Sequence, residues 1–325
     1  MLAEQTRDEV FEASVRSQLE VIDAALLTAA EADSDMVTEA AQHIITAGGK
    51  RFRPLLVVLG SFFGPREAAA DVVKAAVVVE LTHVASLYHD DVMDEARIRR
   101  SSPSANSRWG NTVAILVGDL LFARASDIVC DLGPEFVRLQ ARTFSRLVQG
   151  QIAETVGPGG TDPLDHYLRV VADKTGSLIA TSALFGSKIS DAAPHMQRAM
   201  AEFGEQIGIV FQLSDDIIDI TSNETGKTPG TDLREGIPTL PTLLARKSTD
   251  PADGRLLQLL DSDLHDDDAL QEVLDLLRHH RCIDQSRDEV RRRAEAARAL
   301  LDPLPIGPAR DALDDLCTTV VTRTV

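Results

Sequence analysis

The segment REAAADVVKAAVVVELTHVASLYHDDVMDE, residues 66–95, decides the fold class of this chain. Its apolar residues recur with helical spacing and no glycine or proline interrupts it, so it predicts one long, largely buried helix. Similar segments follow along the chain, separated by glycine, proline, serine and asparagine. The predicted helices span residues 8–32, 36–47, 54–63, 66–95, 111–131, 134–156, 163–190, 195–221, 239–247, 252–261, 267–281, 284–301 and 308–322. The sequence therefore predicts an all-α fold, a large helical bundle in a single domain over residues 1–325, without an identifiable strand.

The composition agrees with a folded helical protein. Apolar residues make up 44% and charged residues 26% of the 325 positions, and aromatic residues make up only 4%, which favours helix over sheet. The strongly apolar stretches, such as PLLVVLGSFF at 54–63, fall short of the roughly 18 residues of a membrane span. The first residues, MLAEQTRDEVFEASV, lack the basic and apolar regions of a secretory signal. We therefore expect a cytoplasmic protein with no membrane span.

The net charge argues against whole classes of partner. Thirty-three basic and 51 acidic residues give a formal charge of −18, so long-range repulsion opposes nucleic acids and anionic membrane surfaces. We expect no nucleic-acid partner. An anionic substrate would need a local basic cluster or a metal ion.

Two short segments share the pattern DDxxD: HDDVMDEA at 89–96 and SDDIIDIT at 214–221. On a helix, residues at i and i+4 share a face, so Asp90 lies beside Asp94 while the second aspartate is turned by about 100°. Such a concentration of carboxylates is costly unless cations neutralise it, and oxygen ligands favour hard cations such as Mg²⁺. Two facing motifs could hold a diphosphate through several Mg²⁺ ions; the alternative is two solvated acidic surfaces. The predicted metal ligands are Asp90, Asp91, Asp94, Asp215, Asp216 and Asp219.

Basic residues gather around these motifs in an otherwise acidic chain. GGKRFRP at 48–54 places three cations between a glycine pair and a proline-started helix, the arrangement of a phosphate-binding turn. His83 lies two helical turns before Asp90 on the same face, where it could donate to a phosphate. Each of these residues could instead be a surface charge or a core residue. The candidates for substrate binding are Lys50, Arg53, His83, Arg99, Arg100, Lys174, Thr175, Gln212 and Lys227.

Together these segments resemble the trans-isoprenyl diphosphate synthases of the long-chain type, also called polyprenyl synthetases. The motifs, in the family's order, are GGKRFRP at 48–54, LTHVASLYHDDVMDEARIRR at 81–100, KTGSL at 174–178, FQLSDDIID at 211–219 and GKTPGTDLREG at 226–236. The resemblance covers residues 40–245. It implies an isoprenoid synthase-like bundle with a central apolar cavity, in which isopentenyl diphosphate is added head to tail to an allylic diphosphate. It also implies three Mg²⁺ ions per active site with substrate bound.

The resemblance assigns roles residue by residue. Isopentenyl diphosphate is assigned to Lys50, Arg53, His83 and Arg100, and the allylic diphosphate to Arg99, Lys174 with Thr175, Gln212 and Lys227. The residues expected to act in catalysis, through charge on the departing diphosphate, are Asp90, Asp91, Asp94, Arg99, Lys174, Asp215 and Asp216. No protein general base is expected, since by resemblance the released diphosphate takes the proton. Two positions depart from the family pattern: Ile237 stands where lysine is usual, and Ser101 where glycine is usual.

The small residues before the first motif bear on product length. By resemblance, enzymes with short products carry an aromatic residue four or five positions before the first aspartate, where this chain has Ser86 and Ala85. Small residues leave the floor of the cavity open, so we expect a C30 to C50 product for a quinone side chain. Phe144 or Leu147 on a neighbouring helix could form a deeper stop. Ordinary close helix packing is the alternative explanation.

Other hypotheses stay open at this point. A geranylgeranyl or farnesyl diphosphate synthase would share every motif. A class I terpene cyclase is one alternative, but it needs no isopentenyl site. A metal phosphohydrolase, suggested by the His89–Asp90 pair, is another, but it explains neither the second motif nor GGKRFRP. A regulatory or lipid-binding subunit of a heteromeric synthase is a further alternative. By resemblance we also expect a homodimer, with transient membrane contact when product is released.

Overall fold

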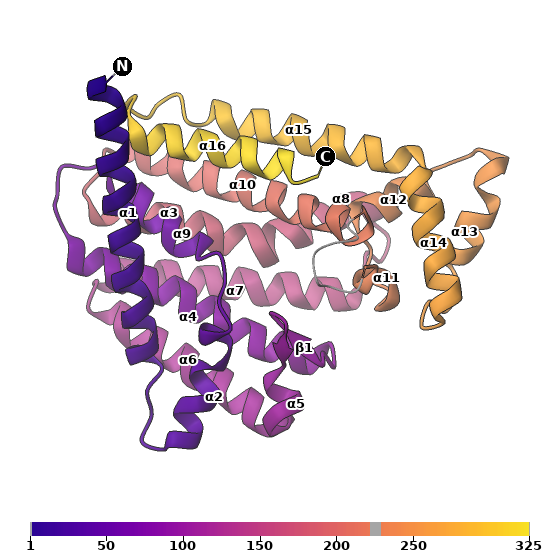
Figure 1. The fold of residues 1–325 in the computed structure, drawn as a ribbon, viewed down its shortest axis with the longest axis horizontal. Helices are drawn as coiled ribbons and strands as arrows, with labels where there is room; N and C mark the ends of the chain where they lie inside the picture. Colours follow the sequence, from indigo (N-terminus) through magenta and orange to yellow (C-terminus); the bar gives the residue numbers. More distant parts are fainter. Residues whose placement is uncertain (1, 222–228, 325) are drawn as a thin grey trace. The chain divides into compact units, whose positions relative to one another are not determined.

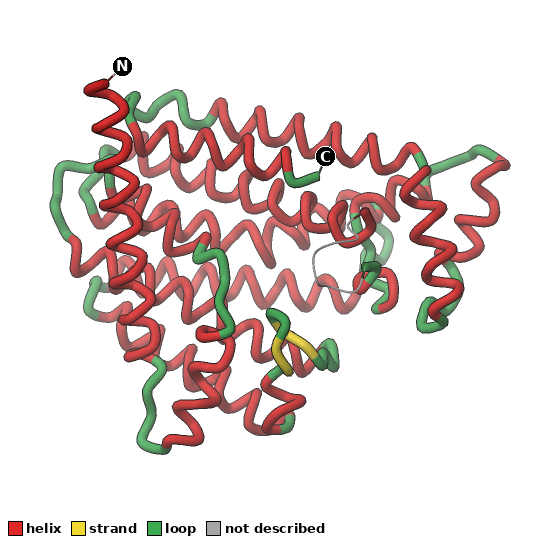
Figure 2. Tube along the Cα trace, viewed as in Figure 1, coloured by secondary structure: helices red, strands yellow, loops and turns green. Residues whose placement is uncertain are grey.

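A computed structural model of the chain describes residues 2–221 and 229–324 (Figure 1). Most of these residues are helical, and Figure 2 shows the strands of the described part as one short hairpin. The predicted all-α class is confirmed. Within these ranges, no helix has both the length and the hydrophobicity that a membrane span requires.

The long helices begin and end near their predicted boundaries. They are α1 (Leu2–Ala29), α2 (Asp35–Thr46), α3 (Phe52–Ser61), α4 (Ala69–Met93), α6 (Asn111–Cys130), α7 (Pro134–Val156), α10 (Pro194–Thr221), α14 (Asp267–His279), α15 (Arg281–Ala299) and α16 (Pro308–Thr322). The shorter elements are β1 (Ile98–Arg99), β2 (Ser102–Pro103), α5 (Ala105–Trp109), α11 (Thr231–Arg234), α12 (Leu240–Arg246), the 3₁₀ turn η2 (Pro251–Asp253) and α13 (Gly254–Leu260). The β1–β2 hairpin, α5 and α11 were not predicted, because such short elements show no hydrophobic period.

The helix predicted over 163–190 is divided into three elements. α8 (Pro163–Val171) leads into a π-helical turn, η1 (Ala172–Gly176), and α9 (Ser177–Ile189) follows. A π turn adds one residue between hydrogen-bonded groups, and such turns occur frequently at functional sites. Here the turn contains Lys174 and Thr175 of the predicted site.

By their internal packing the described residues form two compact units. The first comprises Met1–Ser145, Leu178–Gly204 and Leu301–Leu313. Its central element is α4, which contacts α1, α3, α5 and α6. Tyr88 of α4 is fully buried and its hydroxyl donates to the Ala40 carbonyl of α2. These contacts fix the helix that carries the first aspartate motif.

Two glycines let α3 and α9 approach at backbone distance within the first unit. A Cβ atom on Gly186 would lie 2.0 Å from the Val57 carbonyl oxygen, and one on Gly60 would lie 2.7 Å from the Ala183 carbonyl oxygen. No larger residue fits at either position without moving a helix. The crossing therefore holds α3, which follows the GGKRFRP turn, against α9.

The second unit comprises Arg146–Ser177, Glu205–Leu300 and Asp314–Val325. Its α12 contacts α8, α13, α14 and α15. A buried apolar cluster joins α12, α13, α14 and α15 to the end of α10; its members include Ile220, Leu233, Ala245, Leu256, Val273, Leu277, Cys282 and Ile283. Because Ile220 belongs to this cluster, the end of α10 that carries the second aspartate motif is anchored in the core of the unit.

Candidate active site

The first aspartate motif lies where α4 ends. Asp90 and Asp91 belong to its last turn, and Asp94 follows the last helical residue, with its backbone N–H donating to the Asp90 carbonyl at 2.8 Å. Asp90 is half-buried and Asp94 is exposed, whereas the Asp91 side chain is fully buried. The motif therefore offers solvent two carboxylates and encloses the third.

An arginine holds the enclosed carboxylate. Arg99 Nε and Nη2 lie 2.7 Å and 2.6 Å from Asp91 Oδ1. Burial raises the pKa of Asp91, while the charge and hydrogen bond of Arg99 oppose that rise. Among the described residues, the buried Oδ2 of Asp91 has no hydrogen-bond partner. That oxygen keeps its capacity to accept a hydrogen bond or bind a cation.

The β1–β2 hairpin brings two arginines back to the helices. Its loop residues Arg100 and Ser101 have φ of 52° and 62°, the signs of a type I′ turn. Glycine adopts this conformation at lower cost, which gives a physical reason for the glycine expected at position 101. Arg100 Nη1 donates to the Ile44 carbonyl at 2.9 Å and also to the Gly48 carbonyl, so the hairpin is tied to the end of α2.

Three arginines surround one buried acid in the first unit. Arg51, the N-cap residue of α3, donates to Asp23 Oδ1 at 2.5 Å and to Glu80 Oε1 at 3.4 Å. Glu80 is 2% exposed, and its charge also acts on Arg53 and Arg100. Since one buried carboxylate faces three guanidinium groups, the cluster keeps an excess of positive charge that suits an anion.

Two of the four residues assigned to isopentenyl diphosphate, Arg53 and Arg100, belong to this arginine cluster, and their charges act on a third, His83. Burial lowers the pKa of Arg53 to about 10, and among the described residues its buried Nε has no hydrogen-bond partner. Burial, followed by the charges of Arg53 and Arg100, lowers the pKa of His83 well below its usual value, so His83 is neutral. Lys50 precedes the cluster in sequence and is exposed.

The chain-length candidates lie on α4 and α7. Ala85 is fully buried, and a Cβ atom on Gly118 of α6 would lie 3.2 Å from its carbonyl oxygen, so Ala85 lies at a close helix crossing. Ser86 Oγ donates to the His83 carbonyl at 2.8 Å. Phe144 is half-buried against the Phe122 ring, with 4.4 Å between ring centroids. Leu147 is 9% exposed and belongs to the second unit.

The second aspartate motif also encloses its middle carboxylate. Asp216 is 2% exposed, and its Oδ2 accepts from the Tyr167 hydroxyl and from the Leu240 backbone N–H at 3.1 Å. Its Oδ1 accepts from Gln212 Nε2 at 3.2 Å. Burial raises the pKa of Asp216 to about 6, although all three donors lower it. Gln212 thus touches the motif itself, and Tyr167 and Leu240 hold it from α8 and the start of α12.

The outer aspartates of this motif are half-buried. Asp215 Oδ1 lies 2.7 Å from Nη2 of Arg323, which follows α16. Asp219 accepts from the backbone N–H groups of Thr231 and Asp232, each at 3.4 Å. Because both outer aspartates are less buried than Asp216, they are better placed than Asp216 to bind a cation.

Lys174 lies in the π turn η1 and is paired with an acid. Its Nζ is 2.5 Å from Glu154 Oε2 of α7, and Thr175 Oγ1 donates to Gln212 Oε1 at 3.3 Å. A Cβ atom on Gly150 would lie 2.6 Å from the Lys174 backbone nitrogen, so this glycine permits the close approach of α7. The second unit therefore brings Lys174, Thr175 and Gln212 into one connected group.

The loop after the second motif is described only in part. Lys227 lies outside the described residues. Ile237 is half-buried, and its backbone N–H donates to the Asp232 carbonyl at 2.8 Å. Position 237 therefore stabilises the turn without supplying a positive charge.

The donor set suits a hard divalent cation. Within residues 2–221 and 229–324, no three His, Cys, Asp or Glu side chains form a metal-binding group. Mg²⁺ commonly takes only one or two carboxylates and completes its shell with water and phosphate oxygens. The outer aspartates of each motif and the unpartnered Asp91 Oδ2 fit that mode of binding.

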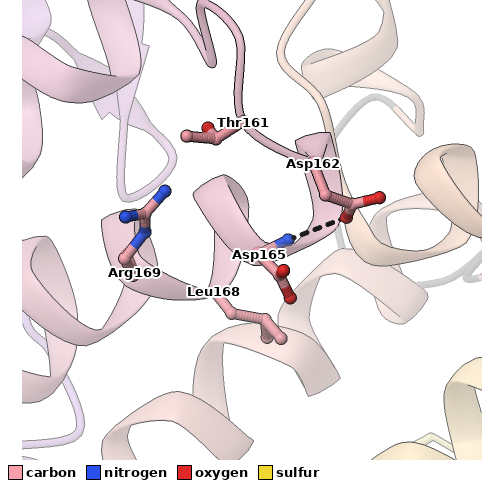
Figure 3. Close-up of a pocket in the computed structure, with 5 residues that line it drawn as sticks. All are labelled: Thr161, Asp162, Asp165, Leu168 and Arg169. Carbon is pink, nitrogen blue, oxygen red and sulfur yellow. Dashed lines mark hydrogen bonds between the residues drawn. The ribbon is translucent and has the colours of Figure 1, made fainter.

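A cavity of about 590 Å³ lies at the start of α8 (Figure 3). It is lined by Thr161, Asp162, Asp165, Leu168 and Arg169. Asp162 caps α8 by accepting from the backbone N–H groups of Leu164 and Asp165 at 2.9 Å and 3.1 Å. Because all five lining residues come from one segment and none belongs to the predicted site, this hollow is a surface feature of α8.

Comparison with known proteins gives the class. A family model described as "Polyprenyl synthetase" matches residues 34–277. The chain therefore belongs to the polyprenyl synthetase family, and its predicted family and prenyltransferase class are confirmed. The helical scaffold and the two aspartate motifs agree with that membership.

Individual relatives cover nearly the whole chain. It is 44% identical to the nonaprenyl diphosphate synthase of Mycobacterium tuberculosis, over 97% of this chain and 95% of that protein. It is 40% identical to a dimethylallyltranstransferase of the same organism, over 91% and 90%. The crystal structure of geranylgeranyl pyrophosphate synthase from Corynebacterium glutamicum, complexed with calcium and isoprenyl diphosphate, is 44% identical, with a TM-score of 0.87 over 97% of each chain.

Several residues of the site were not predicted from sequence. Glu80 lies one helical turn before His83, so the same periodicity that identified His83 could have identified it. Glu154, Tyr167 and Arg323 lie 20 to 108 residues from their partners Lys174, Asp216 and Asp215. Pairing over such distances depends on the tertiary fold and leaves no local pattern.

Proposed function

We propose that this protein is a polyprenyl diphosphate synthase that adds isopentenyl diphosphate head to tail to an allylic diphosphate. The observation that carries the proposal is common to the two aspartate motifs. Each buries its middle aspartate among hydrogen-bond donors and leaves the outer two accessible to solvent. The outer aspartates can then bind metal while the middle ones hold the motif in place.

The two units act together in this proposal as one catalytic domain. Family membership leads us to expect that both aspartate motifs serve the same reaction. Mg²⁺, with three ions per site, would be held by Asp90, Asp94, Asp215 and Asp219 and would neutralise the diphosphate. A relative's crystal structure complexed with calcium and isoprenyl diphosphate supports a divalent cation.

The arginine cluster of the first unit would bind isopentenyl diphosphate. Arg53 and Arg100 supply charge, and neutral His83 supplies a hydrogen bond. Glu80 prevents the arginines from repelling one another out of position. Lys50, at the exposed turn, would reach the diphosphate from solvent.

The reaction depends mainly on stabilising the charge that develops on the departing diphosphate. The carbon–oxygen bond of the allylic diphosphate breaks, the isopentenyl double bond attacks the allylic carbon, and a proton is lost to the released diphosphate. Lys174, Thr175 and Gln212 would hold the departing diphosphate, together with Lys227 and with Arg99, which also fixes Asp91. Preorganised cations stabilise the charge that develops on the leaving group.

Product length would depend on the floor of the cavity. Ala85 and Ser86 place no aromatic ring at the expected floor, which supports a C30 to C50 product, with Phe144 or Leu147 as a deeper stop. The nonaprenyl synthase relative agrees with a long product. The equally similar geranylgeranyl synthase structure makes a C20 product the second candidate. The tight packing of Ala85 against α6 favours this shorter product.

An apolar strip on α7 supports a homodimer. Val148, Ile152 and Val156 recur every four residues and are 38%, 56% and 77% exposed. Ile115 and Leu116 of α6 are also exposed apolar residues. A second copy of the chain would remove such helical faces from water. A cytoplasmic location and membrane contact during product release stay predictions.

Product analysis tests the proposal. The purified chain is incubated with Mg²⁺, farnesyl diphosphate and labelled isopentenyl diphosphate, and the dephosphorylated products are separated by length. Products of C30 to C50 that disappear with EDTA would support both the activity and the open floor. Products ending at C20 would keep the activity and refute the floor argument; cyclic hydrocarbons or no product would refute the synthase proposal.

A further inference from the structure

Arg323 contributes a positive charge to the second aspartate motif that sequence motifs do not reveal. Its Nη2 donates to Asp215 Oδ1 at 2.7 Å, and its guanidinium carbon lies 4.8 Å from the centroid of the Phe211 ring. Within the described part of the chain, its buried Nη1 has no hydrogen-bond partner. A buried charged donor without an acceptor is costly, so this position suits an anionic acceptor.

The main chain around Arg323 is anchored within the second unit. Ser214 Oγ of α10 donates to the Val320 carbonyl at 3.0 Å, and Arg287 Nε of α15 donates to the Thr324 carbonyl at 2.8 Å. Thr324 is only 3% exposed. Arg323 is therefore presented to the motif from a fixed backbone, and the Phe211 ring orients its plane.

We propose that Arg323 is a substrate-binding residue that donates to the diphosphate of the allylic substrate. The inference rests on the proposed function, because metal ions at Asp215 would bring that diphosphate beside the same guanidinium group. A planar guanidinium matches two phosphate oxygens at once, which a lysine ammonium does not. Ile237 contributes no charge where the family usually has lysine, and Arg323 supplies a cation to the motif from another part of the chain.

Calorimetric titration of the full-length chain tests the assignment. Inorganic pyrophosphate is titrated in the presence of Mg²⁺, so the readout is binding and no turnover is needed. We expect Arg323→Gln to weaken pyrophosphate about 10- to 100-fold, as for the loss of a charge-assisted hydrogen bond, and Arg323→Lys to weaken it less. Arg310→Gln is the matched control, because Arg310 of α16 pairs with Asp302 at 3.1 Å and touches no predicted site residue.

Two outcomes would overturn the assignment. Unchanged affinity in Arg323→Gln would mean that the arginine does not contact the diphosphate, and tighter affinity would mean that it competes with the metal for Asp215. If the glutamine variant does not fold, Arg323→Lys carries the test, and affinity equal to that of the Arg310→Gln control overturns the proposal.

Steady-state kinetics separates this inference from the proposed function. Arg323→Gln should raise KM for farnesyl diphosphate and leave KM for isopentenyl diphosphate near that of the unmodified chain. If the unmodified chain elongates farnesyl diphosphate and the variant shows the same KM, only the role of Arg323 fails. If the unmodified chain makes no prenyl product, the proposed function fails, and the pyrophosphate titration still decides whether Arg323 binds an anion.

Discussion

The two aspartate motifs hold their middle carboxylates by different chemistry. Asp91 is paired with the guanidinium group of Arg99, a permanent positive charge. Among the described residues, the hydrogen-bond donors to Asp216 are all neutral: the Tyr167 hydroxyl, the Leu240 backbone N–H and the Gln212 amide. In a buried place a charged partner favours ionisation more strongly than neutral donors do. The first arrangement depends on one ion pair, whereas the second depends on several weaker hydrogen bonds.

The difference in burial within each motif predicts different roles for the outer and the middle aspartates. The outer aspartates are half-buried or exposed, whereas the middle ones are buried and connect the helix end to its neighbours. Substitution of outer and middle residues should therefore separate loss of activity from loss of stability.

The largest effect is expected at the outer positions. Asp90→Asn and Asp215→Asn each remove the charge of a proposed metal ligand, which is worth several kcal/mol of transition-state stabilisation, so kcat should fall about 100-fold or more. Urea unfolding should change by less than about 1 kcal/mol, because both side chains are partly solvated. The exposed Asp127 of α6 is the control, and Asp127→Asn should alter neither quantity.

Activity retained in Asp90→Asn or Asp215→Asn would contradict the metal assignment. Loss of activity in only one of the two variants would show that a single motif suffices for catalysis.

The next largest effect is expected when the ion pair of the first motif is broken. Arg99→Met leaves the fully buried Asp91 without its counter-charge, which should lower the free energy of unfolding by about 3 kcal/mol. Arg97 immediately precedes β1 and is exposed, so Arg97→Met should change the free energy of unfolding by less than about 0.5 kcal/mol. Adding Asp91→Asn to Arg99→Met should recover part of the loss, and no recovery would mean that the buried charge is not its cause. Urea unfolding in EDTA measures all four proteins.

The parts of this site that depend on residues close together in the sequence can be predicted from it, whereas the parts that depend on distant residues cannot. Helical periodicity locates α4 and α10, and the i, i+4 spacing indicates which aspartates share a face, so both motifs could be predicted. The hairpin that returns Arg99 to Asp91 contains strands of two residues, too short to show alternation. The π turn at Lys174 interrupts what the sequence presents as one continuous helix. Partners such as Tyr167 and Arg323 meet their aspartates only through tertiary packing.

The smallest effect, and the one that most directly tests the difference between the motifs, is the pH dependence conferred by Asp216. Its folded-state pKa of about 6 lies above the usual value near 3.9, so the folded protein binds this proton more tightly than the unfolded chain does. That contribution to stability is fully present below about pH 4 and is lost as pH rises through about 6, by at most about 3 kcal/mol.

The variant Asp216→Asn cannot titrate at this position. Relative to that variant, the unmodified chain should therefore lose stability between about pH 4 and about pH 7.5 when both are unfolded by urea in EDTA. Tyr167→Phe should move the transition to higher pH, since the tyrosine hydroxyl stabilises the ionised carboxylate. If the difference in unfolding free energy between the chain and Asp216→Asn stays constant over this range, Asp216 titrates normally and its three neutral donors offset the effect of burial.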